Sequence, residues 1–403
     1  MIHSFTCSNF YSFGDSATIN FVVDKNAPNN SGYFVTSAGT RLSKVETVIG
    51  SNASGKTNVL KALPFLKWLI VDSFKEQPGE HLPVQPFAFC KKNKEASDLS
   101  VTFEIEGKIY TYAFSVSSSR IEEEILKVTS FVKEKKATKK LFSRTWNKAT
   151  KSYEFDPGRF QLPKEFKNLL RDNASVIGTA ARLNHSESKT IAKYWQNLET
   201  NVVEAGWVGD RLMPNATQQL LEAFAFFGDN NPLKKEAEKL LARFDLGLDS
   251  FQIKKEKTEN GMNLQVRAIH TIDGDTYPMH LNYESSGTKQ LFVLLKSILL
   301  ALAHGTVAVI DEFDVNLHPE MLLALVDLFV QEDTNPKNAQ LLFSSHSHLV
   351  LSRLDKYQII LVEKNEKSMS EAWRLDYVSG VRPDDNYFAK YLAGAYGAVP
   401  NIK

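Results

Sequence analysis

The sequence predicts an α/β fold, and three observations predict it. An apolar, β-branched run, Val45–Ile49, leads into a glycine-rich loop and then into a helical pattern. Two further apolar runs, Val307–Ile310 and Gln340–Ser344, end in polar residues, a pattern typical of strands buried in a sheet. An alternating β block near residues 99–155 and a mostly helical block near residues 160–245 lie between these strands. The helical block therefore interrupts the sheet domain.

Length and composition set the class of protein. The chain has 403 residues, more than most single compact domains, and its 43% hydrophobic and 24% charged residues are ordinary for a soluble globular protein. We expect a first lobe over residues 1–158, a helical insertion over 159–248 and a second lobe over 249–403. The net charge of +1 gives no global attraction to nucleic acid, so any such site has to be a local patch.

Three features favour a cytoplasmic protein with no membrane segment. The only cysteines, Cys7 and Cys90, lie in apolar surroundings, which argues against a disulfide framework or a zinc site. The first residues lack the basic region and apolar core of a secretory signal. The longest apolar stretches, such as residues 291–303, are interrupted by Lys296 and Ser297 and are too short to span a bilayer.

The N-terminal strands and the glycine-rich loop come first in the chain. Residues 2–23 are predicted to form two strands around residues 9–14. The loop matches the phosphate-loop pattern G-x-x-x-x-G-K-[ST] at every fixed position. Its residues, with the one that follows, are Gly50, Ser51, Asn52, Ala53, Ser54, Gly55, Lys56, Thr57 and Asn58. A chance match in a Gly/Ser turn would not require the strand before it and the helix after it.

The position of the loop indicates its chemistry. Gly50 and Gly55 let the backbone curl so that its N–H groups point at one anion, and the helix N-terminus adds partial positive charge. Lys56 is then placed to reach the β- and γ-phosphates of a nucleotide, and the Thr57 hydroxyl to ligate Mg²⁺. We therefore expect ATP and Mg²⁺ at this loop.

The β block carries a basic run. Residues 101–105 and 109–114 flank Glu106-Gly107, which predicts a tight turn, and residues 121–132 are another alternating run. A single acid, Glu134, then lies among basic residues, which are Lys133, Lys135, Lys136, Lys139, Lys140, Arg144, Lys148 and Lys151, with Phe142 and Trp146 between them. Both a nucleic-acid patch and a solvated hairpin tip explain this run.

Helices and then strands follow. Residues 162–245 are predicted to be mostly helical, with a helix start at Asn231-Pro232, and no long heptad run supports a coiled-coil arm. Residues 250–281 return to strands, with turns at Asn260-Gly261 and Asp273-Gly274. Residues 283–290 then precede an apolar helix, where Ser-Ser-Gly alone would indicate only a cap.

Two strand ends complete the predicted site. Val307–Ile310 ends in Asp311 and Glu312, and a buried strand with paired carboxylates at its end is unusual unless a cation or a proton transfer uses them. Asp311 is placed to hold Mg²⁺ through water, and Glu312 to act as base or orienter for an attacking water. His346 follows the next strand, and since open sheets bind ligands at such ends, we interpret it as a γ-phosphate sensor. Strand-end acids that cap the next turn and a structural histidine are the alternatives.

The order of these motifs resembles the ABC-type ATPases of the SMC, RecF and OLD group. Residues 284–289, Glu-Ser-Ser-Gly-Thr-Lys, stand where that group has its Leu-Ser-Gly-Gly-Glu-Lys signature, and residues 315–318 stand where it has the D-loop. The opening residues 9–13 resemble the Asn-Phe-Arg-Ser-Phe start common there. The closing residues 391–401 resemble the end of small prokaryotic ATPases of the RloA and abortive-infection type.

The resemblance implies an ABC-type ATPase head with an antiparallel β subdomain, a helical insertion and a head-to-tail homodimer or higher homo-oligomer. In that dimer Ser285, Ser286, Gly287 and Lys289 of one subunit would close over ATP held by the other. Gln85 is the candidate for the metal-contacting Q-loop glutamine. Ser286 and Glu284 depart from the signature, and His318 replaces the usual D-loop aspartate. OLD nucleases continue into a Toprim domain, for which too few residues follow His346, so we expect a nuclease to be another polypeptide.

Three functions are compatible with these features. The leading hypothesis is an intracellular anti-phage ATPase that controls a separate effector, a nuclease or toxin encoded nearby. The second is a RecF/SMC-like DNA-repair ATPase that clamps DNA. The third, a transporter ATPase, needs a groove for membrane-domain helices that the β and helical blocks do not suggest. Neighbouring genes would separate the three.

Overall fold

A computed structural model describes most of the chain. The described residues are 1–89, 95–132, 135–202, 216–228, 231–244, 247–258 and 261–400. Cys90, Lys133, Glu134 and Asn260 lie outside them, and so does part of the predicted helical insertion.

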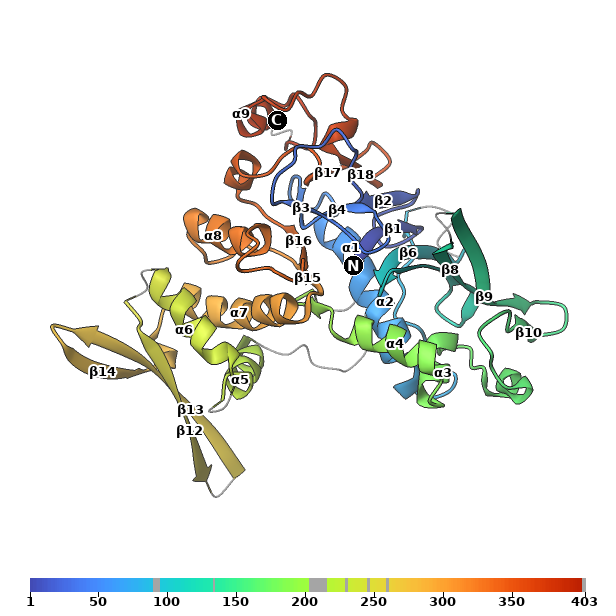
Figure 1. Ribbon diagram of the computed structural model, residues 1–403, viewed down its shortest axis with the longest axis horizontal. Coiled ribbons are helices and arrows are strands. Elements are labelled where there is room, and N and C mark those ends of the chain that lie inside the picture. The colour runs from blue at the N-terminus through green and yellow to red at the C-terminus, as the bar shows by residue number, and fades with distance from the viewer. Residues whose placement is uncertain are drawn as a thin grey trace.

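The central sheet has six strands in the order β11-β15-β16-β5-β17-β18. Figure 1 labels β15, β16, β17 and β18 of this sheet. Their bounds are β5 (Val45–Ile49), β11 (Glu199–Thr200), β15 (Val307–Ile310), β16 (Gln340–Ser344), β17 (Ile359–Lys364) and β18 (Ser370–Arg374). All neighbours are parallel except β17 and β18. Every residue of β5, β15 and β16 is buried, as the continuous apolar runs in the sequence indicate.

The central sheet separates two hydrophobic cores, because successive side chains of a strand point to opposite faces. Val48, Val309 and Leu342 face the first core, which also contains α1 (Lys56–Leu60) and α2 (Ala62–Val71). Ile49, Ile310 and Phe343 face the second core. That core contains α5 (Ala216–Phe226), α6 (Leu233–Arg243), α7 (Ser286–His304), α8 (Pro319–Val330) and α9 (Tyr387–Leu392).

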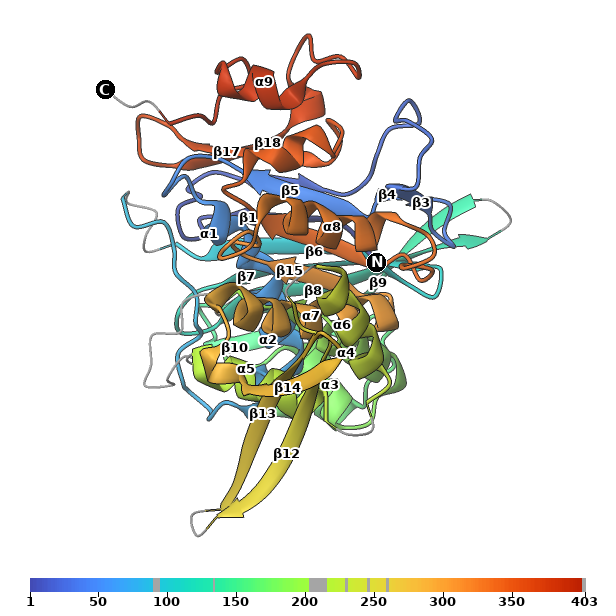
Figure 2. The ribbon, with the colours of Figure 1, turned by 90° about the vertical axis from the view of Figure 1, so that its left-hand side faces the viewer.

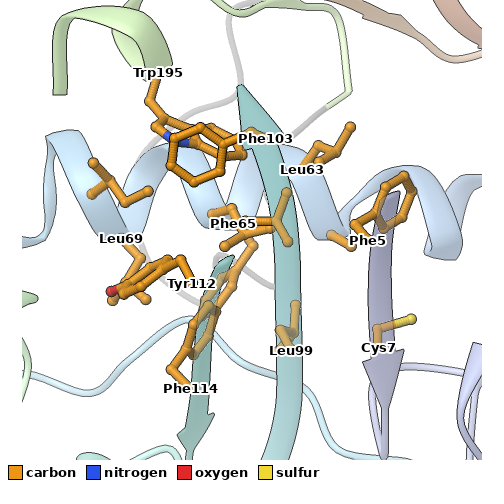
Figure 3. Close-up of a cluster of buried hydrophobic side chains, with 14 of the residues drawn as sticks. Phe5, Cys7, Leu63, Phe65, Leu69, Leu99, Phe103, Tyr112, Phe114 and Trp195 are labelled. Carbon is orange, nitrogen blue, oxygen red and sulfur yellow. The ribbon is translucent and has the colours of Figure 1, made fainter. Parts of the chain in front are cut away.

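A seven-stranded antiparallel sheet covers the far side of the first core, in the order β10-β9-β8-β7-β6-β1-β2. Its bounds are β1 (Ile2–Ser8), β2 (Ala17–Asn20), β6 (Ser97–Ile105), β7 (Lys108–Val116), β8 (Ile121–Val132), β9 (Lys135–Asn147) and β10 (Ser152–Asp156). Figure 3 shows Phe65 and Leu69 of α2 against Phe103 and Tyr112 of this sheet, with Trp195 beside them. The predicted tight turn is present, since Ile105 pairs with Lys108 and both turn residues have positive φ.

Among the residues that the structure describes, the basic run consists of β9 and the turn at residues 148–151, and its members differ in environment. Arg144 is fully buried and forms an ion pair of 2.7 Å with Glu124, which also accepts a hydrogen bond of 2.8 Å from the Tyr112 hydroxyl. Lys140 pairs with Asp156 at 2.5 Å. Arg144 therefore belongs to the interior of the first lobe and is not available to nucleic acid.

The helices of the predicted insertion divide between the two cores. The turn η3 (Lys164–Leu169), α3 (Val176–Arg182) and α4 (Ser186–Gln196) contribute to the first core, whereas α5 and α6 pack on α7 in the second. The proposed boundaries at residues 158 and 248 stay a prediction.

Smaller elements complete the fold. The strands β12 (Ser250–Thr258), β13 (Gly261–Ile272) and β14 (Asp275–His280) form a sheet that projects from the second lobe (Figure 2). The remaining pair is β3 (Tyr33–Val35) and β4 (Arg41–Ser43). Besides η3, the described residues form the 3₁₀ turns η1 (Ser73–Lys75), η4 (Leu281–Tyr283), η5 (His348–Ser352) and η6 (Leu375–Tyr377).

The apolar stretch at residues 291–303 is part of α7, a helix of 19 residues. In the described part of the chain, α7 is the one helix long and apolar enough to cross a membrane. Half of the apolar window is buried inside the protein, and α7 packs against β11, β15, α5 and α6. These contacts are those of a core helix. The helix is nevertheless longer than residues 291–303, the stretch that we expected to be too short to span a bilayer.

Candidate functional site

The glycine-rich loop joins β5 to α1, and two of its glycines are required by close packing. A Cβ atom at Gly50 would lie 2.1 Å from the Val362 carbonyl oxygen of β17. Gly55 has a φ of 118°, and its Cβ would lie 2.3 Å from the Ser370 hydroxyl oxygen. Any other residue at either position would push the loop away from the sheet.

The loop encloses the ammonium group of Lys56, whose side chain turns back onto it. Its Nζ donates to the carbonyl oxygens of Gly50 at 3.0 Å and Ser51 at 3.1 Å. Burial lowers the pKa of Lys56, and the nearby carboxylates, chiefly Asp311, act in the opposite direction. The cation is therefore held inside the curl of the loop and close to the acids of β15.

The paired acids at the end of β15 are fixed by the neighbouring strand β16. The Ser344 hydroxyl donates to Asp311 Oδ1 and accepts from the Glu312 N–H at 2.8 Å. The Asn201 side chain also contacts the Asp311 backbone. Glu312 has a φ of 49°, a left-handed conformation uncommon outside glycine, and its side chain is exposed. Asp311 is thus held by hydrogen bonds on its β16 and β11 sides, and Glu312 follows it in a strained backbone conformation.

His346 follows β16 and is anchored through its backbone. Its N–H donates to both carboxylate oxygens of Asp314, at 3.0 and 3.1 Å, while its ring is exposed. His348 lies deeper and its ring centroid is 4.8 Å from that of Tyr391. Burial lowers the pKa of His348, with a smaller contribution from His346. The structure therefore presents His346, rather than His348, to solvent at the strand ends.

These groups meet in one open cavity of about 630 Å³, here called the strand-end cavity. Its lining residues are Asn52, Ala53, Gly55, Lys56, Thr57, Asn58, Asp311, Glu312, His346 and Lys364. All but one were predicted as site residues. The exception, Lys364 at the end of β17, has no local motif in the sequence.

The lining of the cavity does not include three predicted loop residues, Gly50, Ser51 and Ser54, nor the four predicted signature residues and the candidate metal contact described next. Ser285 caps α7, accepting from the Thr288 N–H at 3.0 Å, and both Ser285 and Ser286 are exposed. A Cβ at Gly287 would lie 2.5 Å from the Asn316 carbonyl oxygen. Lys289 donates to the Asn282 carbonyl at 3.2 Å. The stretch of residues 284–289, here called the signature loop, therefore packs on the segment after the acids but does not line the cavity.

Gln85 also lies outside the strand-end cavity. Its side chain is exposed, and its backbone carbonyl accepts from the Tyr11 N–H at 2.7 Å. In this structure the contact that Gln85 makes with the N-terminal segment is thus through the backbone.

A hydroxyl network ties the N-terminal segment to the loop. The Ser12 hydroxyl accepts from Asn58 Nδ2 at 2.8 Å and contacts the Ser370 hydroxyl at 2.7 Å. Ser370 also donates to the Ser54 carbonyl at 2.5 Å. In the sequence only the resemblance of residues 9–13 pointed to this region, and nothing pointed to Ser370.

The residues present fit a nucleotide and a magnesium ion. The glycine curl leaves no room for a Cβ, and the Lys56 ammonium is buried inside it. The Thr57 hydroxyl and the Asp311 carboxylate share the same cavity and are the oxygen donors that Mg²⁺ prefers. The fit concerns the chemistry of the donors, which is that of a polyphosphate site.

Comparison with known families decides the class of protein. The family model described as "AAA domain, putative AbiEii toxin, Type IV TA system" matches residues 47–352, which is more than half of the chain. The chain belongs to this AAA-domain family. The match runs from the middle of β5 to the end of η5, so it contains the loop, the acids and His346. The α/β fold and the resemblance to ABC-type AAA ATPases are thereby confirmed.

Three solved structures of SMC heads are among those that match this chain. An SMC head bound to the C-winged helix domain of ScpA is 15% identical, with a TM-score of 0.46, covering 93% of this chain and 97% of that one. An SMC head with an extended coiled coil from Pyrococcus furiosus, bound to the C-terminal domain of ScpA, is 14% identical, with a TM-score of 0.44 and coverages of 93% and 96%. One from Pyrococcus yayanosii, with a coiled coil and joint, is 12% identical, with a TM-score of 0.44 and coverages of 98% and 99%. No curated protein matches this AAA-domain chain.

Proposed function

We propose that this AAA-domain protein binds ATP with Mg²⁺ and hydrolyses it to ADP and phosphate. The observation that carries the proposal is the convergence of Lys56, Asp311, Glu312 and His346 in the strand-end cavity. They come from the ends of three adjacent parallel strands, which is where open α/β sheets bind ligands.

Each residue has a role that its position supports. The loop N–H groups and Lys56 bind the phosphates, and Thr57 and Asp311 hold the metal, directly or through water. Bound Mg²⁺ and ATP would supply the electrophilic phosphoryl group. Glu312 is exposed to the cavity and takes a proton from, or orients, the attacking water. His346 contacts the terminal phosphate, and Lys364 adds a second cation to the wall.

We propose further that two copies assemble head to tail around ATP. The support is that Ser285 and Ser286 of the signature loop are exposed and that the loop lies outside the cavity of its own chain. A second copy could present Ser285, Ser286, Gly287 and Lys289 to the open side of that cavity. ATP bound between two copies stabilises the dimer, and hydrolysis releases it.

The cellular role that we propose is intracellular defence against phage, in which the ATPase controls a separate nuclease or toxin encoded nearby. The description of the family contains the words "putative AbiEii toxin, Type IV TA system". The helices α3 to α6 offer the contact surface, since the ATP face is committed to the dimer. Co-expression with the neighbouring gene and co-purification with and without ATP test this role. Phage protection that persists without that gene contradicts it.

A RecF/SMC-like DNA clamp is the second candidate, and the basic strand β9 favours it. The exposed Lys139 lies on that strand, although Arg144 is buried.

The direct test of the proposed activity is ATP turnover by purified protein. We expect Mg²⁺-dependent phosphate release, and we expect Lys56→Ala to weaken nucleotide binding itself, because it removes a charge-assisted contact. Lys148→Ala, at an exposed turn far along the chain from the loop, is the matched control. Lys56→Ala protein that binds ATP as the wild type does would remove Lys56 from this role.

A further inference from the structure

Asn201 forms two hydrogen bonds with the backbone of Asp311. The Asp311 N–H donates to Asn201 Oδ1 at 2.7 Å, and Asn201 Nδ2 donates to the Asp311 carbonyl at 2.9 Å. The ladder between β11 and β15 ends at the pairing of Thr200 with Val309. The Asn201 amide therefore replaces a backbone partner and extends this ladder past the end of the strand, to the residue that is to hold the metal.

The segment that carries Asn201 is fixed along the whole of β15. The Thr306 hydroxyl, just before β15, donates to the Asn197 carbonyl at 2.8 Å. Lys67 of α2 donates to the Leu198 carbonyl at 2.7 Å. Val202, which follows Asn201, is buried in the first core. Asn201 thus lies in a segment that is held by hydrogen bonds to α2 and to the residue before β15, and by the burial of Val202.

The backbone of Glu312 has an unfavourable conformation that neighbouring contacts have to hold in place. A residue with a φ of 49° is held there only when its surroundings over-determine it. On the β16 side, Ser344 binds the Glu312 N–H through its hydroxyl and the Phe313 N–H through its carbonyl, at 2.8 and 3.0 Å. On the β11 side, Asn201 fixes the Asp311 backbone. The two sides together set the peptide from which the Glu312 side chain enters the cavity.

We propose that Asn201 is a positioning residue for hydrolysis: its amide holds the Asp311 backbone and thereby keeps the next residue, Glu312, in its place in the strand-end cavity. This inference rests on the proposed function, and no motif in the sequence points to it. Asn201 belongs to the predicted insertion. A shift of the segment that carries it would therefore also change the positions of Asp311 and Glu312. The insertion can therefore influence turnover without touching the nucleotide.

Kinetics of Asn201→Ala test the role. We expect kcat to fall about tenfold or more, with KM and ATP affinity within about twofold, because misplacement of a reacting group slows chemistry more than it weakens binding. Asn197→Ala is the matched control, since that residue contacts Thr306 through its backbone carbonyl and not its side chain. Wild-type kcat from Asn201→Ala overturns the proposal.

A double variant separates positioning from general damage to the fold. If Asn201 acts through Glu312, adding Asn201→Ala to Glu312→Gln costs little beyond the single Glu312→Gln loss in single-turnover rate. A further tenfold loss, multiplied onto the first, shows an independent effect and contradicts the proposal.

Amide hydrogen exchange gives a readout that does not depend on turnover. We expect the Asp311 N–H to exchange at least about tenfold faster in Asn201→Ala than in the wild type and in Asn197→Ala, because its acceptor is gone. Unchanged Asp311 exchange overturns the inference about Asn201. If instead the wild type releases no phosphate while Asp311 exchange responds, the proposed function fails and the contact stands.

Discussion

The strand-end cavity and the signature loop are built in different ways. In the cavity, groups from β5, β15, β16 and β17 of one chain converge and are fixed by contacts such as Ser344 to Asp311 and Ser370 to Ser54. In the signature loop, Ser285 and Ser286 are exposed, and the Ser285 hydroxyl contacts Thr288 at the start of its own helix.

This difference indicates that a single chain can complete the strand-end cavity, whereas the signature loop needs a second surface for the role that we propose. Preorganised groups bind a ligand without further ordering, so we expect the strand-end cavity of one chain to be sufficient for the proposed nucleotide binding. Ser285 caps its own helix, and we expect its exposed side and that of Ser286 to act on nucleotide only when a second copy brings them to a cavity. Variants in the cavity should therefore change events within one chain, and variants in the signature loop should change events between chains.

The largest expected effect is in the cavity. Glu312→Gln should bind ATP as the wild type does and lose about a hundredfold or more in turnover, because the amide cannot take the proton while Asp311 stays in place. Phosphate release and nucleotide affinity are both measured. Glu332→Gln, at an exposed glutamate beyond α8, is the control. Wild-type turnover from Glu312→Gln protein free of contaminating ATPase removes Glu312 from this role.

The signature loop should respond differently. Ser285→Arg is expected to abolish turnover and leave the ATP affinity of the chain unchanged, since a bulky cation blocks a face that serves the other copy. Ser119→Arg, at an exposed turn of the first lobe, should leave both unchanged. A large loss of ATP affinity in Ser285→Arg would show that the loop acts on its own chain.

A smaller effect should appear at the support of the phosphate loop. Ser370→Ala removes hydrogen bonds to the Ser54 carbonyl and the Ser12 hydroxyl at a buried position. At about 1 kcal/mol for such a bond, ATP affinity should fall roughly fivefold. Calorimetric titration measures it, with Ser368→Ala in the adjacent exposed turn as control. Equal affinities for the two variants would mean that the hydroxyl network does not hold the loop.

The smallest expected effect concerns the basic strand. Changing Lys135, Lys136, Lys139 and Lys140 to Glu should leave duplex DNA affinity unchanged if the protein acts in defence through a protein effector. A DNA clamp would instead lose affinity, and its binding would fall by roughly 0.9 log unit per phosphate contact per tenfold rise in salt. Titrations at two salt concentrations separate the two functions.

Local sequence patterns were enough to predict most of the fold and much of the candidate site. The phosphate loop, the acids after β15 and the turn at Glu106-Gly107 depend on neighbouring residues, because strand ends and left-handed turns have short-range signatures. Their arrangement in a single cavity follows from the parallel sheet. These features could be predicted from sequence alone.

Contacts between distant segments could not be predicted in this way. Asn201 meets Asp311 across 110 positions, and Ser370 meets Ser12 across 358. Asparagine and serine are common on surfaces, and nothing nearby in the sequence distinguishes these two. Arg144 is a case in which the local pattern misleads. It belongs to a basic run that suggests an exposed residue, but it forms a buried ion pair with Glu124 once β8 and β9 associate.

The central claim is that the cavity of one chain works with the signature loop of another, and a mixing experiment tests it most directly. Ser285→Arg and Lys56→Ala are each expected to be inactive alone. A mixed dimer contains one composite site with an intact cavity and an intact signature loop, so mixing should restore part of the ATP turnover. No restored turnover, although mixed dimers demonstrably form, would contradict the shared site.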